Sequence, residues 1–214
     1  MTGRMDKKEI RRSILAVRDG IPIEDRARFD YEIKKRVLTH SVYKEAEVIL
    51  AYASYRSEVD TAALIRQALT DGKYVFAPKV SGDEMEFWQI TGTEVLQEGY
   101  KGIPEPVESI SFPEWIAGIN TGREGYEKTC HVMMWMPGAV FDKDRHRIGY
   151  GKGFYDRYLS RMTVLKEKLS CEYRMKLHLT IAALAYSCQM LGQIPHEPHD
   201  IRPDMVITEE ICIN

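Results

Sequence analysis

The chain has 214 residues, of which 44% are hydrophobic and 29% are charged, the composition of an ordinary soluble globular protein. Its 30 basic and 32 acidic side chains leave a net charge of −2. No overall basic field would therefore attract a nucleic acid, and an anionic ligand would need a local site. The length favours a single domain over 1–214.

The N-terminal charges and the cysteine spacing indicate the compartment. Residues 4–19 are rich in charge and contain no apolar run, so we expect no secretory signal. No apolar run approaches the roughly 20 residues that span a bilayer. Cys130, Cys171, Cys188 and Cys212 lie far apart without a C-x-x-C pair, which argues against a zinc site and a disulfide framework. We expect a cytoplasmic protein with no membrane partner. The oligomeric state is left open, with a monomer slightly favoured.

Hydrophobic periodicity predicts alternating helices and strands. In chain order we expect helices over 5–18 and 23–39, a strand over 47–53, a helix over 61–71, strands over 74–77, 85–90 and 132–136, a helix over 154–177, and strands over 180–186 and 204–208. Residues 109–131 show little periodicity and are expected to form a surface excursion. The strand–helix–strand spacing implies a parallel sheet. The expected fold is α/β and Rossmann-like, with three layers: an open, mostly parallel sheet with helices on both faces.

Ligands of such sheets bind beyond the carboxyl ends of the strands. We therefore expect the chemistry of this protein in the loops that follow Ala53, Ala77, Met136 and Tyr186.

The strongest local pattern is a glycine-rich turn before the predicted helix 154–177. Its glycines alternate, at Gly149, Gly151 and Gly153, so the backbone can approach a ligand and direct N–H groups at it. The helix that follows adds its positive end, an arrangement suited to phosphate. Neither a Walker motif nor a G-x-G-x-x-G fingerprint is present. A turn whose glycines serve backbone geometry alone is the alternative.

Charged side chains flank this turn. Arg147 and Lys152 could neutralise a polyphosphate, and Asp156 in the first helical turn could bind a magnesium ion.

A second pattern, Ile194-Pro195-His196-Glu197-Pro198-His199-Asp200, invites a metal interpretation. The spacing is not that of H-E-x-x-H, and Pro198 disfavours the helix that would align the two imidazoles. A polar loop is the favoured interpretation of the histidines. Asp200 is the better candidate ligand, because magnesium prefers carboxylate oxygens.

Two weaker patterns complete the set. Glu58 follows the predicted strand 47–53, where its carboxylate could accept hydrogen bonds from an amino-heterocycle, although a solvated loop residue is the more common case. Lys7 and Arg11 lie four residues apart and so share a face of the first helix, for which a solvated surface is the default interpretation.

Taken together, six segments resemble the 5-formyltetrahydrofolate cyclo-ligase family, also called methenyltetrahydrofolate synthetases. They are K-x-x-x-R at 7–11, S-E-V-D-T at 57–61, G-I-P-E-P at 102–106, M-P-G-x-x-F-D at 136–142, R-I-G-Y-G-K-G-F-Y-D-R at 147–157 and I-P-x-E-x-H-D at 194–200. The resemblance implies a ligase of one-carbon metabolism that converts 5-formyltetrahydrofolate to 5,10-methenyltetrahydrofolate. The implied reaction needs ATP and Mg²⁺ and releases ADP and phosphate, with phosphorylation of the formyl oxygen before ring closure.

The resemblance also implies a role for each matching residue. Those implied to bind ATP are Lys7, Arg11, Arg147, Gly149, Tyr150, Gly151, Lys152, Gly153, Phe154 and Tyr155. Catalysis is implied for Arg147, Lys152 and Tyr155, substrate binding for Ala53, Glu58 and Phe154, and magnesium binding for Asp156 and Asp200. In this scheme Glu58 anchors the pterin of the folate.

Two other interpretations stay open. A non-catalytic nucleotide- or folate-binding paralogue would keep the fold and the pocket. A different enzyme on a similar scaffold, such as a sugar-phosphate isomerase or an acyl-CoA-handling protein, would use the glycine turn but leave Asp156 and Asp200 without a role.

Overall fold

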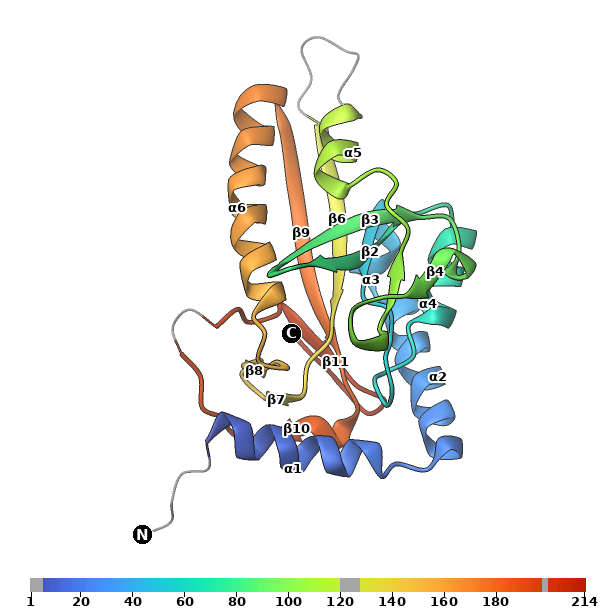
Figure 1. The fold of residues 1–214 in the computed structure, drawn as a ribbon, viewed down its shortest axis with the longest axis vertical. Coiled ribbons are helices and arrows are strands. Elements are labelled where there is room, and N and C mark those ends of the chain that lie inside the picture. Colours follow the sequence, from blue (N-terminus) through green and yellow to red (C-terminus); the bar gives the residue numbers. More distant parts are fainter. Residues whose placement is uncertain (1–5, 120–127, 198–199) are drawn as a thin grey trace.

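The computed structural model describes residues 6–119, 128–197 and 200–214 (Figure 1). Its centre is a seven-stranded sheet in the order β12-β11-β9-β6-β1-β2-β3. The strands are β1 (Val48–Ala51), β2 (Tyr74–Ser81), β3 (Glu84–Ile90), β6 (Lys128–Met136), β9 (Met175–Leu184), β11 (Met205–Ile207) and β12 (Cys212–Ile213). Neighbours from β11 to β2 pair in parallel, and only the edge strands β12 and β3 are antiparallel. The expected mostly parallel sheet is confirmed.

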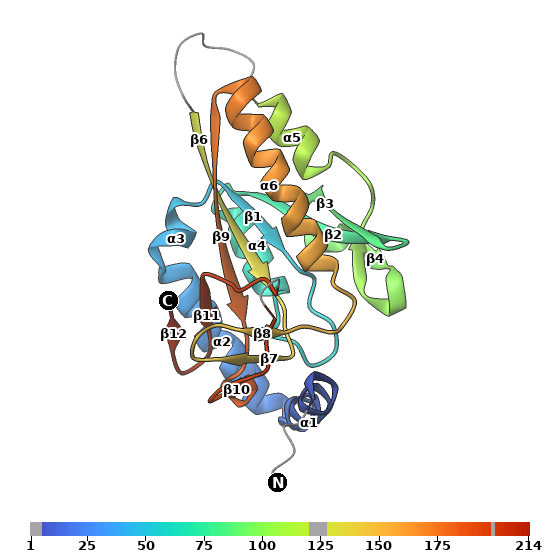
Figure 2. The ribbon, with the colours of Figure 1, turned by 90° about the vertical axis from the view of Figure 1, so that its left-hand side faces the viewer.

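Helices cover both faces of this sheet. They are α1 (Lys7–Asp19), α2 (Ile23–Thr39), α3 (Ser41–Glu45), α4 (Ala62–Thr70), α5 (Phe112–Gly118) and α6 (Phe154–Tyr173). Residues of α2, α3 and α4 pack into the core of one face, and residues of α5 and α6 into the core of the other. These three layers are the predicted architecture. Figures 1 and 2 show α1 apart from them, lying across the end of the molecule towards which β6 and β9 run.

The boundary between α6 and β9 differs from the prediction. The helix expected to reach residue 177 ends at Tyr173, and Arg174 follows in a left-handed conformation with φ of 49°. The next strand, expected at 180, already begins at Met175. Its early residues pair in register with the first residues of β6, which itself begins at Lys128 rather than at 132. Pairing along the whole length of β6 thus overrides the local helical pattern.

The segment 109–131 is only partly the surface excursion that we expected. Its residues 112–118 form α5, which begins with a capping box between Ser111 and Glu114. The side chains of Phe112 and Ile116 are completely buried in the core that also contains α6. The interpretation as an excursion is therefore wrong for α5, and residues 120–127 lie outside the described part of the chain.

The burial of α5 predicts how substitutions in it should change the free energy of unfolding. Ile116→Val removes one buried methylene group and should lower the free energy of unfolding by about 0.5–1.5 kcal/mol. The same substitution at Ile110, which is 37% exposed, should change it by less than about 0.5 kcal/mol. Urea unfolding followed by circular dichroism measures both variants. Equal small effects at the two positions would show that α5 does not belong to the core.

Two smaller sheets are present beside the central sheet. One contains β10 (Met190–Leu191), β7 (Val140–Asp142) and β8 (Arg147–Ile148), and the other β4 (Leu96–Glu98) and β5 (Pro104–Pro106). The buried Asp142 ties the β7–β8 hairpin together, because its Oδ1 accepts hydrogen bonds from the backbone N–H groups of Asp144 and His146. No helix in the described residues is long and apolar enough to cross a membrane.

Candidate active site

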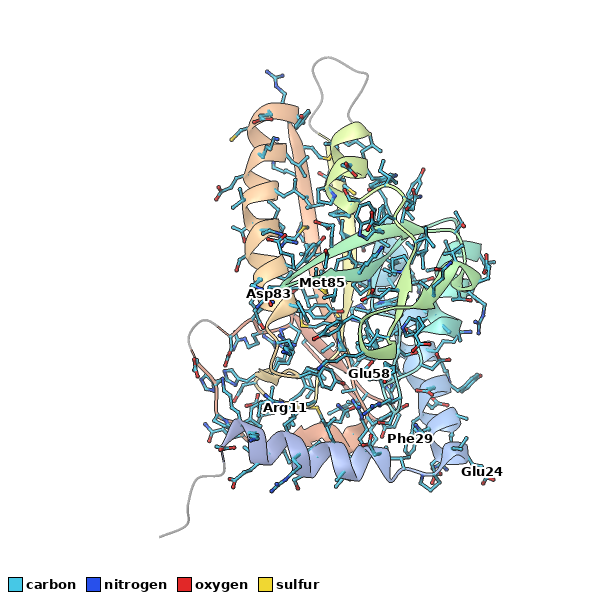
Figure 3. All side chains as sticks on the ribbon, in the orientation of Figure 1. Arg11, Glu24, Phe29, Glu58, Asp83 and Met85 are labelled. Carbon is cyan, nitrogen blue, oxygen red and sulfur yellow. The ribbon has the colours of Figure 1, made fainter. Side chains whose placement is uncertain are left out.

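A pocket of about 840 Å³ lies where the central strands end, between α1 and the start of α6. Its wall contains all of the predicted site residues: Lys7, Arg11, Ala53, Glu58, Arg147, Gly149, Tyr150, Gly151, Lys152, Gly153, Phe154, Tyr155, Asp156 and Asp200. In Figure 3, Arg11 is labelled above α1 and Glu58 on the loop after β1. Residues far apart in the chain therefore meet at one place, although the role of each remains a prediction.

Of the four loops expected to carry chemistry, those after Ala53 and Met136 contribute to this wall, through Ala53 and Pro137. The loop expected after Ala77 was predicted wrongly, because β2 continues to Ser81 and Pro78 lines the pocket as a strand residue.

The fourth loop, between Tyr186 and the predicted strand 204–208, reaches the wall at its far end through Asp200, whereas its first residues do not line the pocket in the described chain. Its Gln189 instead donates hydrogen bonds to the carbonyl oxygens of Gly138 and Ala139. These hydrogen bonds hold the segment that follows β6 in place.

The glycine turn has backbone geometry that other residues would not readily adopt. Gly151 and Gly153 have φ values of 89° and 67°, in the left-handed region, and Gly153 caps the N-terminus of α6. At Gly149 the constraint is space, because a Cβ there would lie 2.8 Å from Nη1 of Arg147. The turn thus brings backbone and the positive end of a 20-residue helix to the pocket.

Arg147 is a buried cation with a donor left over. Its side chain comes from β8, and its Nη2 lies 3.0 Å from Oδ1 of Asp156. Its Nη1 is 3.5 Å from the carbonyl oxygen of Pro137, but its Nε finds no acceptor among the described residues. An unsatisfied buried donor costs about 1–3 kcal/mol. A ligand oxygen that reached this group would remove that cost.

The first helix brings two further cations to the same place. A capping box between Asp6 and Glu9 begins α1 next to Lys7. Arg11, one turn later, donates from Nε to the carbonyl oxygen of Gly149 at 2.6 Å. With the exposed Lys152 of the turn itself, these side chains surround the pocket with positive charge.

Both predicted metal ligands reach the pocket, and each is held by a cation. Asp156 pairs with Arg147, as above, and Oδ2 of Asp200 lies 2.6 Å from Nζ of Lys7. Carboxylate oxygens for a magnesium ion, cations for phosphate and the spare Nε of Arg147 therefore occur together. This set of donors and acceptors fits a magnesium nucleotide.

Glu58 lines the same pocket and lies among tyrosines. Its Oε2 accepts a hydrogen bond from the backbone N–H of Tyr55 at 3.0 Å, and its carboxylate is also hydrogen-bonded to the hydroxyl of Tyr150. Burial raises the pKa of Glu58 in spite of these bonds and of the nearby Arg18. Burial, with the charge of Glu58, also raises the pKa of Tyr155, whose hydroxyl keeps its proton at neutral pH.

The histidine of the 194–200 segment that the structure describes lies against another histidine. The ring of His196 stacks on that of His146, with centroids 3.5 Å apart and planes at 6°. Nδ1 of His146 in turn lies 3.0 Å from Oδ2 of Asp142. His199 lies outside the described residues.

Several residues of the pocket wall were not predicted, among them Arg18, Tyr55, Tyr100 and Lys101. Arg18 could have been found, because it follows Arg11 by seven residues and so shares its helix face. Tyr100 and Lys101 come from a short 3-10 turn in an irregular stretch, where periodicity carries no signal.

The three-layer fold and the pocket at its strand ends define a class of protein, an α/β protein whose cation-lined pocket suits a polyanionic small molecule. Known proteins narrow that class. Residues 4–209 match the model of the 5-formyltetrahydrofolate cyclo-ligase family. The chain belongs to this family, and it is a ligase.

Individual relatives agree with that assignment. The chain is 29% identical over 196 residues to the 5-formyltetrahydrofolate cyclo-ligase of Mus musculus, covering 89% of this chain and 87% of that protein. It also resembles the solved 5,10-methenyltetrahydrofolate synthetase of Aquifex aeolicus, at 27% identity and a TM-score of 0.75, covering 97% and 92% of the two chains. The synthetase of Mycoplasma pneumoniae shares the fold, with 23% identity, a TM-score of 0.63 and coverage of 96% and 99%.

Proposed function

We propose that the protein converts 5-formyltetrahydrofolate to 5,10-methenyltetrahydrofolate, using ATP and Mg²⁺ and releasing ADP and phosphate. The observation that carries this proposal is the meeting of phosphate-type and folate-type groups in one pocket. The cations, the glycine turn and the half-buried carboxylate of Glu58 all line it.

The reaction must turn a poor leaving group into a good one. Bound ATP supplies a phosphoryl group for the formyl oxygen of the substrate. The neighbouring folate nitrogen then attacks the formyl carbon and loses its proton, the carbon–oxygen bond breaks, and the oxygen leaves with the phosphoryl group as phosphate, which takes up the proton. The protein contributes positioning and charge neutralisation, which together account for most of the catalysis of phosphoryl transfer.

In this proposal the chain's own residues divide the work. Lys7, Arg11 and Lys152 hold the triphosphate, and Arg147 offers its spare Nε to a phosphate oxygen. Asp156 and Asp200 would hold the magnesium ion, which would offset phosphate charge.

The folate side uses groups of a different kind. Glu58 accepts hydrogen bonds from the amino-heterocycle, and the protonated hydroxyl of Tyr155 is available as a donor. The ring of Phe154, which packs edge-on against Tyr100 with centroids 6.1 Å apart, provides an aromatic wall. Ala53, buried just after β1, has a small side chain that leaves room for the substrate.

The test is an absorbance assay for methenyltetrahydrofolate. Purified protein is supplied with 5-formyltetrahydrofolate and ATP, with and without Mg²⁺, and we expect product only when all are present. Folded protein that binds both ligands in a calorimeter but gives no product would refute the proposal in favour of a non-catalytic binding protein.

Glu58→Gln should weaken folate binding and change the pH dependence of stability. Loss of a hydrogen bond to a charged group, worth about 1.5–3 kcal/mol, predicts a rise in the KM for 5-formyltetrahydrofolate of about tenfold or more. Burial makes the pKa of Glu58 higher in the folded protein than in the unfolded chain. The wild type therefore loses stability as the pH rises from the unfolded-state pKa to the folded-state pKa. Glutamine does not titrate, so the variant should gain thermal stability relative to wild type between pH 4.5 and pH 8. Parallel melting curves across this range would contradict the assigned burial of Glu58.

A further inference from the structure

Arg18 in the last turn of α1 is a buried cation bonded to two separate loops. Its side chain is one of the few charged ones in the core, and the residue is 5% exposed. Its Nε donates to Oγ of Ser57 at 3.0 Å, and its Nη1 donates to the hydroxyl of Tyr150 at 2.8 Å. Ser57 belongs to the loop after β1, and Tyr150 belongs to the glycine turn.

Both of these bonds lead to Glu58. Ser57 precedes it in the chain, and the hydroxyl of Ser57 donates in turn to the carboxylate of Asp19. The hydroxyl of Tyr150 is hydrogen-bonded to the carboxylate of Glu58 itself. One guanidinium therefore fixes the loop that carries Glu58 and also the tyrosine that contacts Glu58 from the glycine turn.

Stability alone does not account for this arrangement. Taking a charged group out of water costs several kcal/mol, and apolar side chains of similar volume often serve packing as well or better. Arg18 instead uses two nitrogens of its planar guanidinium for two acceptors on different loops; an apolar residue could bond neither, and a lysine has only one nitrogen for both. Such geometry suits a residue that holds two parts of a site in register.

We propose that Arg18 is a positioning residue that couples the folate side of the pocket to the nucleotide side through Tyr150 and Glu58. The proposal rests on the proposed function, since it takes Glu58 as the folate contact and the glycine turn as the nucleotide contact. A nucleotide that orders the glycine turn then also orders Tyr150, and Tyr150 orders Glu58. The two ligands should therefore bind with positive cooperativity, each tightening the other by the same factor.

The experiment measures this factor directly by calorimetry. The affinity for 5-formyltetrahydrofolate is determined with and without a non-hydrolysable ATP analogue and Mg²⁺. In the wild type we expect at least about fivefold tighter folate binding with the analogue, the lower end of typical coupling. Arg18→Met should reduce the factor to less than twofold and raise the folate KM about tenfold, with kcat changed less than KM. Arg18→Lys keeps the positive charge but not the planar guanidinium group, so it should recover only part of the coupling.

Two further variants separate coupling from a general loss of structure. Tyr150→Phe keeps Arg18 but removes the hydroxyl between it and Glu58, so it should lose the coupling as well, and the double variant should lose no more than either single one. Arg12→Met on the exposed face of α1 should behave as wild type. If Arg18→Met does not fold, as judged by circular dichroism, Tyr150→Phe carries the test.

The outcomes distinguish this proposal from the proposed function. If a folded Arg18→Met or Tyr150→Phe variant shows the same coupling factor as the wild type, the proposed role of Arg18 is wrong. It is also wrong if the ATP analogue does not change the folate affinity of the wild type. Cooperative binding of both ligands without turnover would refute the proposed reaction but support the coupling. If the wild type binds neither ligand, both proposals fail.

Discussion

Lys152→Ala is expected to lower kcat about 100- to 1,000-fold while the protein stays as stable as wild type. Removing one preorganised group that stabilises charge in a transition state has an effect of this size. Lys152 lies between Gly151 and Gly153 on the pocket wall, where its ammonium group would meet the charge that develops during phosphoryl transfer. Its side chain is exposed, so its truncation should change the free energy of unfolding by less than about 0.5 kcal/mol.

The matched control is Lys168→Ala, which removes an exposed lysine from the C-terminal half of α6. Steady-state kinetics with varied ATP, together with thermal melting, should show wild-type behaviour for this control and a loss of kcat for Lys152→Ala. A Lys152→Ala enzyme with unchanged kcat and unchanged KM for ATP would remove this residue from the site.

The glycine turn illustrates what a sequence can predict about this site. Its signal is local: the alternation of Gly149, Gly151 and Gly153 and the helix that follows are written in consecutive residues. The structure has the left-handed conformations at Gly151 and Gly153 that such glycines permit. Glu58, Lys7 and Arg11, by contrast, were predicted to belong to the site only because of the family resemblance. The local sequence around each of them is that of an ordinary surface residue.

What could not be predicted depends on contacts between distant parts of the chain. The residues after Arg174 alternate apolar and polar side chains, but the preceding helical pattern runs into them, and pairing with β6 decides in favour of a strand. The burial of α5 likewise depends on α6 and the sheet. Arg18 carried the correct helical spacing, yet its importance follows from its bonds to Ser57 and Tyr150, which lie far away in the sequence.

The arrangement of the predicted metal ligands leads to the second large effect. Asp156 is held by Arg147 and Asp200 by Lys7, so each carboxylate already has a cation beside it. Phosphate groups would give Arg147 and Lys7 new anionic partners and leave the carboxylates available for magnesium, which is commonly bound by one or two carboxylates together with substrate phosphates. We therefore expect magnesium to bind weakly without a nucleotide and much more tightly with one.

Asp156→Asn should raise the Mg²⁺ concentration for half-maximal rate at least about tenfold and lower the rate at fixed Mg²⁺ about 100-fold. Loss of a ligand charge weakens the cation site, and charge neutralisation is a large part of phosphoryl-transfer catalysis. The side chain of Asp156 is 37% exposed, so the loss of its ion pair with Arg147 should affect stability much less than activity. Magnesium titrations of the rate, and calorimetric titration of Mg²⁺ into protein with a non-hydrolysable ATP analogue, give two independent readouts. The control is Asp83→Asn, at an exposed turn between β2 and β3, and its rate should depend on Mg²⁺ concentration as in the wild type. An Asp156→Asn enzyme with the wild-type magnesium titration would show that Asp156 serves only to hold Arg147.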